Sequence, residues 1–305
     1  MTRSLQALVL VFAITMPAWT VAAQKGGVAW DTASIEQLTG GKGSLDSAEN
    51  VFKVSLPRND IQATIGGVRI TPPLGLTAWA AFTRVGKQTM VMGDIVLLEN
   101  QVNPVMSIAL DNGLEVTALH NHFLGDNPRV MFMHVGGMGE EKALATAIGK
   151  IFGRLKDTQA KGEELKADID PAKTTLDPAK IEAALGGSYK GELASGVYKV
   201  VIGRETKMGK HGVGKAMGVN TWAAFAGSDE KAVVDGDFAM LETELQDVLK
   251  ALRAGGIQVV AIHNHMTGES PRIMFLHYWG IGRTEALAGT LKAALAKTKH
   301  GSGSR

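Results

Sequence analysis

The alternation of hydrophobic and polar residues predicts the same series of elements twice along the chain. In the first half, a helix ends at residues 40–41. Strands at 51–56, 76–84 and 88–98, a helix at 103–112, strands at 114–122 and 130–135, and a helix at 140–155 follow. The second half predicts a helix from 177, strands at 197–202, 219–225, 231–241 and 257–265, and helices at 243–254 and 284–296. The first half therefore predicts the order α-β-β-β-α-β-β-α, and because the second half repeats its pattern, each half is expected to be an α+β fold with a mainly antiparallel sheet and flanking helices.

The two halves are copies of one domain. At an offset of 143 residues, segment 118–137 aligns with segment 261–280, and 11 of the 20 positions are identical. The same offset aligns the Trp-Ala-Ala-Phe runs that begin at Trp79 and Trp222. A match of this length at a constant offset indicates a duplication. We place the first copy at residues 31–156, a polar linker at 157–176, the second copy at 177–297 and a flexible tail at 298–305.

The first residues have the pattern of a secretory signal peptide. Arg3 supplies a positive charge, residues 5–16 form an apolar run, and residues 21–23 are small enough for cleavage. We therefore predict a signal peptide at 1–23, a mature chain without a stable membrane span, and a periplasmic or secreted location. A retained N-terminal anchor is the alternative.

Composition and charge narrow the class of protein. A hydrophobic content of 45% and a charged content of 20% are typical of a globular chain. A formal net charge of +2 argues against a nucleic-acid-binding protein, which usually presents a basic surface. The sequence has no cysteine, so any metal ion must be held by His, Asp or Glu.

Each copy carries three histidines in the pattern His-Asn-His-x11-His. The predicted metal ligands are His120, His122 and His134 in the first copy, and His263, His265 and His277 in the second. Residues two apart on a strand point to the same face. If residue 118 lies opposite 134 and residue 120 opposite 132, the three imidazoles converge; a slip of one residue would separate them. The spacing resembles the three-histidine zinc site of carbonic anhydrases, in geometry only.

Three converging neutral imidazoles predict a site for a divalent transition metal with one open position for water or substrate. Zinc is favoured, and copper and nickel are alternatives because they also accept imidazole ligands. Two interpretations without a metal stay open. The histidines would then form either a structural hydrogen-bond cluster or an acid–base site.

Four further residues that the copies share are candidate catalytic residues: Glu99 and Arg129 in the first copy, Glu242 and Arg272 in the second. An arginine at this place suits a carboxylate or phosphate of a substrate. A glutamate suits a general base or a fourth metal ligand. A salt bridge between the glutamate and the arginine of one copy is the structural alternative.

The remaining shared polar and aromatic residues receive structural interpretations. Asp94 and Asp237 follow glycines and are interpreted as turn residues. Trp79 and Trp222 are interpreted as core residues or cleft walls. His211 lies in a glycine-rich segment and has no counterpart in the first copy.

The combination of a TWAAF-like strand with HNHxxGxxPRxMFxH resembles the LppY/LpqO family of exported bacterial proteins. The resemblance covers about residues 35–152 and 181–295. It implies an exported location and a domain type, but no activity. The chain departs from the family's lipoproteins because it lacks a cysteine for lipid attachment.

Three classes of function follow from these features. The first is a metal-dependent enzyme of the hydrolase or lyase type that acts on a small molecule. The second is a periplasmic metal carrier or buffer, and the third is a non-catalytic envelope interaction module. Because duplicated domains often pack as the protomers of a homodimer do, we also expect the two copies to pack on each other.

Overall fold

The computed structural model describes residues 30–157 and 168–299. The predicted signal peptide lies outside the described residues, as do residues 158–167 of the predicted linker and 300–305 of the predicted tail. Both copies of the domain belong to one compact unit, Thr32–Arg305. No described helix combines the length and the apolar composition needed to cross a membrane.

The first copy contains three α-helices and six strands of a long sheet. Its elements are α1 (Thr32–Thr39), β1 (Lys42–Asp46), β2 (Val51–Pro57), β5 (Thr77–Val85), β6 (Gln88–Leu98), α2 (Glu99–Asp111), β7 (Glu115–His120), β9 (Val130–Gly139) and α3 (Glu141–Lys156). The short strands β3 (Thr64–Ile65), β4 (Val68–Arg69) and β8 (Asp126–Asn127) form a separate small sheet, and η1 (Pro72–Leu74) leads into β5.

The second copy repeats this plan after the short helix η2 (Pro171–Lys173). Its elements are α4 (Pro178–Ala184), β10 (Gly191–Ala194), β11 (Val197–Gly203), β14 (Asn220–Gly227), β15 (Ala232–Leu241), η4 (Glu242–Glu244), α5 (Leu245–Ala254), β16 (Gln258–His263), β18 (Ile273–Gly282) and α6 (Thr284–Leu295). Its small sheet consists of β12 (Thr206–Met208), β13 (His211–Val213) and β17 (Glu269–Ser270), with η3 (Lys215–Met217) next in the chain after β13.

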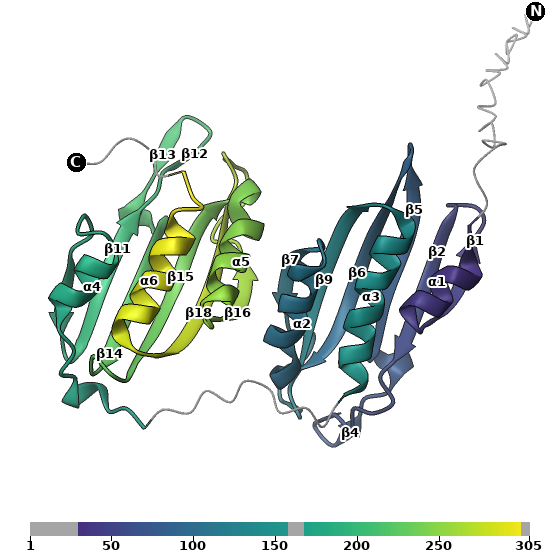
Figure 1. Cartoon of the computed structure of the whole chain (residues 1–305), viewed down its shortest axis with the longest axis horizontal. Coiled ribbons are helices and arrows are strands. Elements are labelled where there is room, and N and C mark those ends of the chain that lie inside the picture. The colour runs from purple at the N-terminus through teal and green to yellow at the C-terminus, as the bar shows by residue number, and fades with distance from the viewer. Residues whose placement is uncertain (1–29, 158–167, 300–305) are drawn as a thin grey trace, which may run out of the picture. The chain divides into compact units, whose positions relative to one another are not determined.

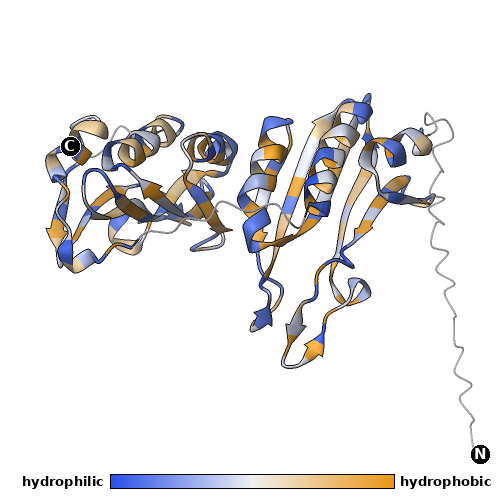
Figure 2. Cartoon of the chain, turned by 60° about the horizontal axis from the view of Figure 1, so that its bottom comes forward, coloured by the Kyte–Doolittle hydropathy of each residue, from blue (hydrophilic) through white to orange (hydrophobic). Residues whose placement is uncertain are grey.

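The long strands form a sheet in the order β1-β2-β5-β6-β9-β7-β16-β18-β15-β14-β11-β10, and the pairs between them are antiparallel. The helices of each copy lie on one face of its strands (Figure 1). Helix α3 packs on β6 and β9, and α6 packs on β15 and β18. Figure 2 shows hydrophilic and hydrophobic residues mixed along these helices, as expected of helices that bury one side. Each copy is therefore an α+β domain, as the sequence predicts, and none of the described α-helices lies on the opposite face of its sheet.

Three details of the predicted elements were wrong. Strand β1 was not predicted, because it is almost wholly exposed and shows no apolar alternation. Helix α2 begins at Glu99 and not at Asn103, since the side chain of Gln101 accepts a hydrogen bond from the backbone N–H of Leu98 at the start of the helix. Strand β7 ends at His120, so His122 follows the strand instead of belonging to it.

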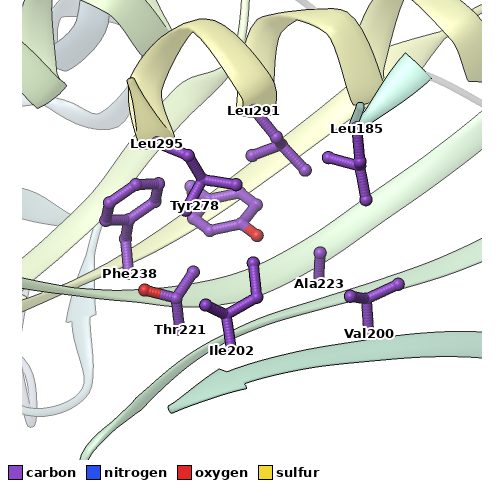
Figure 3. A pocket seen from close by; sticks show the side chains of 9 residues that line it. All are labelled: Leu185, Val200, Ile202, Thr221, Ala223, Phe238, Tyr278, Leu291 and Leu295. Atoms are coloured by element: carbon purple, nitrogen blue, oxygen red, sulfur yellow. The ribbon is translucent and has the colours of Figure 1, made fainter. Parts of the chain in front are cut away.

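The face of the sheet beneath the helices is packed with apolar side chains. Figure 3 shows this packing under α6, where nine residues surround a small cavity: Leu185, Val200, Ile202, Thr221, Ala223, Phe238, Tyr278, Leu291 and Leu295. Its volume is about 10 Å³, which is close to the space that one water molecule occupies. An organic ligand therefore cannot bind in this cavity. We call the opposite face of the sheet, which has no described α-helix on it, the open face.

One end of the open face in the second copy has a hydrophobic cluster of its own. Val219, Ala239, Ile273 and Phe275 are buried there, and the partly buried Val213, Leu241 and Met266 pack against them. Val213 belongs to the small sheet, so that sheet and the loop after β16 cover this end of the strands. Met266 of this cluster anchors the chain directly after the second histidine pair.

Two side-chain amides join the copies within the Thr32–Arg305 unit. The amide of Asn103 donates to the carbonyl of Val259 (3.3 Å) and accepts from its N–H (2.8 Å). Gln246, at the equivalent position of the second copy, makes the same pair of bonds with Val116, both of 2.9 Å. Val116 and Val259 stand at β-bulges, where a strand leaves backbone groups without a ladder partner. The amides supply those missing partners.

Candidate metal centre

The two strands of the histidine hairpin pair in the register that brings the imidazoles together on one face of the sheet. In the first copy, Ala118 lies opposite His134 and His120 lies opposite Phe132, which confirms the predicted pairing. In the second copy, Ala261 lies opposite His277. The ring centroids of His120 and His134 are 5.1 Å apart, and those of His263 and His277 are 4.5 Å apart.

The next strand adds a carboxylate to each hairpin. Asp237 of β15 lies directly opposite His277, and Asp94 of β6 lies directly opposite His134. Asp237 and His277 therefore project from the same face of the sheet. Since Phe238 and Tyr278, the residues that follow them, line the cavity beneath α6, this face is the open face.

In the second copy, three potential ligand atoms lie close together around a common centre. Asp237 Oδ2 lies 3.1 Å from His265 Nε2 and 3.8 Å from His263 Nε2. The two Nε2 atoms are 3.2 Å apart. A triangle with these sides has its centre about 2.0 Å from each corner, which matches the ~2.0–2.2 Å bonds of zinc to nitrogen and oxygen. The three atoms therefore have the spacing of a ligand set around one ion.

Backbone carbonyls fix the tautomers of two histidines. His265 Nδ1 lies 3.2 Å from the carbonyl oxygen of Gly218, and His277 Nδ1 lies 3.4 Å from that of Gly236. A carbonyl only accepts hydrogen bonds, so each Nδ1 carries the hydrogen and each neutral ring keeps its lone pair on Nε2. Such outer hydrogen bonds are usual for histidines that bind a metal through the other nitrogen.

The charges at this site favour the neutral imidazole. Burial, together with His277 and His265, lowers the pKa of His263 to about 4. Burial also raises the pKa of Asp237, against the opposing effect of the neighbouring His277 and His265. Asp237 Oδ1 and His263 Nδ1 are buried without a hydrogen-bond partner in the described part of the chain. The other polar atom of each of these side chains, Asp237 Oδ2 and His263 Nε2, belongs to the set of potential ligand atoms.

The first copy has the same residues in a more open arrangement. The ring of His122 stacks on Phe132 with centroids 3.4 Å apart, as His265 stacks on Phe275 at 3.5 Å. Desolvation lowers the pKa of His122, although Asp94 opposes the shift. Asp94 Oδ1 is buried and lacks a hydrogen-bond partner among the described residues. His122 is exposed, and among the described residues it is the second copy whose ligand atoms gather closely.

The sequence of the chain matches one known protein family. The model of a family described as Domain of Unknown Function (DUF1259) matches residues 33–153 and again residues 179–297. The chain belongs to this DUF1259 family. Neither the curated proteins nor the solved structures include a match to the chain. Each DUF1259 copy contains one complete set of three histidines and an aspartate.

The four predicted catalytic residues lie just outside the strands, at the end where the histidine pairs also stand, because His120 lies opposite Phe132 and His263 lies opposite Phe275. In the first DUF1259 copy, Arg129 Nη1 is 3.7 Å from Glu99 Oε1, and both side chains are 64% exposed. These residues are five positions along β6 and β9 from the Asp94–His134 pair, which corresponds to about 16 Å. In the second copy, the exposed Glu242 and Arg272 are joined by a backbone hydrogen bond from the Glu242 N–H to the Arg272 carbonyl.

The interpretation of Asp94 and Asp237 as turn residues was wrong. Both lie inside long strands, and the glycine before each has a packing reason that the sequence does not display. A β carbon on Gly236 would lie 2.2 Å from the ring and the hydroxyl of Tyr278, which crosses above it. One signal was present: Asp235 and Asp237 alternate with buried residues, which places both on the open face of a DUF1259 strand.

Trp79 and Trp222 are half-buried on the open face, so they belong to the walls of the site and not to the core beneath the helices. His211 is exposed at the start of β13, in the small sheet that has its other edge at β17.

Proposed function

We propose that each DUF1259 copy binds one divalent transition metal ion, with zinc favoured and copper or nickel as alternatives. The observation that carries this proposal is the spacing of Asp237 Oδ2, His263 Nε2 and His265 Nε2 around a common centre. A cysteine-free chain has no thiolate to offer a metal, so carboxylates and imidazoles are its anionic and neutral donors of choice for zinc.

The proposed ligands are one carboxylate and two imidazoles in each copy. In the second copy they are Asp237, His263 and His265, and His277 stands against them as a further nitrogen donor. In the first copy the equivalents are Asp94, His120, His122 and His134. Two histidines and one carboxylate also suit Fe(II), so iron joins the metals to be tested.

The proposed activity is a metal-dependent reaction of the hydrolase or lyase type on a small molecule. Three protein ligands leave a coordination position for water, and a bound metal would lower the pKa of that water. The open face supports this proposal because a substrate reaches the ligands without crossing a helix layer. Arg129 with Glu99, and Arg272 with Glu242, stay proposed as assisting residues.

A metal carrier or buffer is the second candidate function. The observation that favours it is exposure: about a third of the His265 side chain, 32%, is accessible to solvent, and His122 is exposed. Exposed ligands permit exchange of the ion with a partner. An interaction module whose histidines only brace the hairpin is the third.

The proposals for location and assembly come from the sequence. We propose an exported protein, periplasmic or secreted, that is related to the LppY/LpqO family. We also propose that the two copies act as one pseudo-twofold unit. The paired bonds of Asn103 with Val259 and of Gln246 with Val116 support that arrangement.

The test is to count metal ions per chain by plasma mass spectrometry on protein without a histidine tag. We expect about two equivalents, falling by one in His120→Ala/His122→Ala and by one in His263→Ala/His265→Ala. His211→Ala serves as the control and should keep both ions. A folded chain that takes up none of zinc, copper, nickel or iron would overturn the proposal.

A further inference from the structure

The open face of the second copy has another row of side chains beside the candidate metal centre. Asp235 is two residues from Asp237 on β15, so the two carboxylates point to the same face. Asp235 lies opposite Ala224 on one side and Trp279 on the other. Trp222 lies opposite Asp237. Two indoles therefore stand diagonally on either side of the two carboxylates.

These side chains are accessible to a ligand. Trp222 and Trp279 are half-buried, and Asp235 is exposed. The exposed Lys199 lies opposite Ala224, and its Nζ is 4.2 Å from the centre of the Trp222 ring. Ala224 ends in a methyl group, so the space between the lysine and the carboxylate of Asp235 is not filled by a side chain from that strand.

The first copy lacks half of this arrangement. Met92 stands where the second copy has Asp235, and Gly136 stands where it has Trp279. The lysine and the other indole are retained, with Lys53 Nζ 4.1 Å from the centre of the Trp79 ring. The two copies therefore share the histidines and the aspartate but differ in what surrounds them.

We infer that the second copy, unlike the first, binds a neutral carbohydrate beside its candidate metal centre. Indole faces are electron-rich and apolar, so they stack on the polarised C–H faces of sugar rings. A carboxylate accepts hydrogen bonds from sugar hydroxyls, and an ammonium donates to them. The second copy offers all three groups next to one another: Trp222 and Trp279, Asp235, and Lys199.

The spacing of the indoles sets the size of the ligand. Trp222 and Trp279 are two strands apart and two residues apart along the strands, which places their α carbons about 12 Å from each other. A short oligosaccharide spans such a distance better than a single ring. An organic cation fits less well, because Lys199 and a bound metal ion would repel it.

The inference deepens the proposed function, since the sugar would lie next to the metal-bound water. The carbohydrate contacts themselves require no metal. Binding to zinc-loaded protein and to protein treated with a chelator therefore separates the two ideas. Failure of the metal proposal leaves carbohydrate binding measurable, and failure of carbohydrate binding leaves the metal count unchanged.

The experiment is isothermal titration calorimetry of the chain with cellohexaose and with N-acetylchitohexaose, with choline as an organic cation. The variant Asp235→Met/Trp279→Gly gives the second copy the residues of the first. The matched control is Met92→Ala/Gly136→Ala in the first copy. Because Trp279→Gly removes a large side chain, Asp235→Ala is measured as a second variant, and metal content and thermal unfolding report that each variant is folded.

We expect one of the two oligosaccharides to bind at a single site per chain, with and without metal. The affinity should fall about tenfold or more in the double variant and in Asp235→Ala, and it should be unchanged in the first-copy control. Three results would overturn the inference: no binding of either sugar up to about 10 mM, equal affinity in the folded double variant, or binding of choline in preference to both sugars.

Discussion

The hydroxyl of Tyr278 donates a hydrogen bond of 2.9 Å to the carbonyl oxygen of Trp222, two strands away. To reach it, the ring crosses above Gly236 on the strand between them. The tyrosine is wholly buried, and burial raises its pKa well above the usual value, so the hydroxyl keeps its hydrogen. This one contact ties together the strands that carry Trp222, Asp237 and His277.

Gly236→Ala should therefore destabilise the protein by about 3 kcal/mol, because a β carbon would overlap the Tyr278 ring and the Trp222 carbonyl. The free energy of unfolding in urea measures the effect. Gly289→Ala is the control: it lies in α6 with open space around it, and it should stabilise the chain by about 1 kcal/mol. Equal stability of Gly236→Ala and the parent chain would show that the Tyr278 ring does not occupy this place.

Asp237→Asn should lower the metal affinity of the second copy about 100-fold or more, because it removes the charged ligand and keeps the shape of the side chain. Competition with a chelating dye measures the affinity. Asp235→Asn, two residues away on the same face, should leave it unchanged. If both variants bind metal as tightly as the parent chain, Asp237 is not a ligand.

The stability of the second copy should fall at high pH through Tyr198. Its hydroxyl donates to Glu182, and burial together with this bond raises the pKa of Tyr198 to about 12. A raised pKa means that the stabilising contribution is complete below the ordinary value of about 10 and is lost as the pH rises through about 12. The loss should reach about 2 kcal/mol.

Unfolding of the parent chain and of Tyr198→Phe, compared between pH 9 and pH 12, isolates this contribution from the titration of the lysines. The difference in stability between the two proteins should shrink as the pH rises. A difference that stays constant to pH 12 would contradict the assignment.

Asn103→Ala should cost about 2–4 kcal/mol, because it leaves the N–H and the carbonyl of Val259 without their partners. Gln246→Ala should have a similar effect through Val116. The control is Gln62→Ala, an exposed amide whose loss should change stability by less than about 0.5 kcal/mol. Thermal unfolding with two separate transitions in Asn103→Ala would indicate that the copies had lost contact.

The duplication explains why much of the fold was predictable from one sequence. The two copies predict the same element order, and the histidine spacing predicted the hairpin register that places Ala118 opposite His134. The predictions that were wrong concern features that depend on contacts between residues distant in sequence. The start of α2 depends on the Gln101 amide, and the glycine before Asp237 depends on Tyr278, which is 42 positions further along the chain.

The candidate site was predicted in part for the same reason. The histidines are visible as a motif because they lie close together in sequence. Asp94 and Asp237 come from a strand separated from the hairpin by a helix, and only the pairing of β6 with β9 and of β15 with β18 brings them in. The difference between the copies at Asp235 and Trp279 is readable in the sequence, but its position next to the site is not.

Strands β7 and β16 are neighbours in the sheet, where Leu119 lies opposite Ile262, so neither is an edge. A chain cut down to one copy would expose β7 with a row of unsatisfied N–H and carbonyl groups. Such a fragment would need another molecule to pair with those groups, and its oligomeric state would vary with protein concentration. Because both copies belong to one polypeptide, the pairing of β7 with β16 is intramolecular, and dilution does not oppose it.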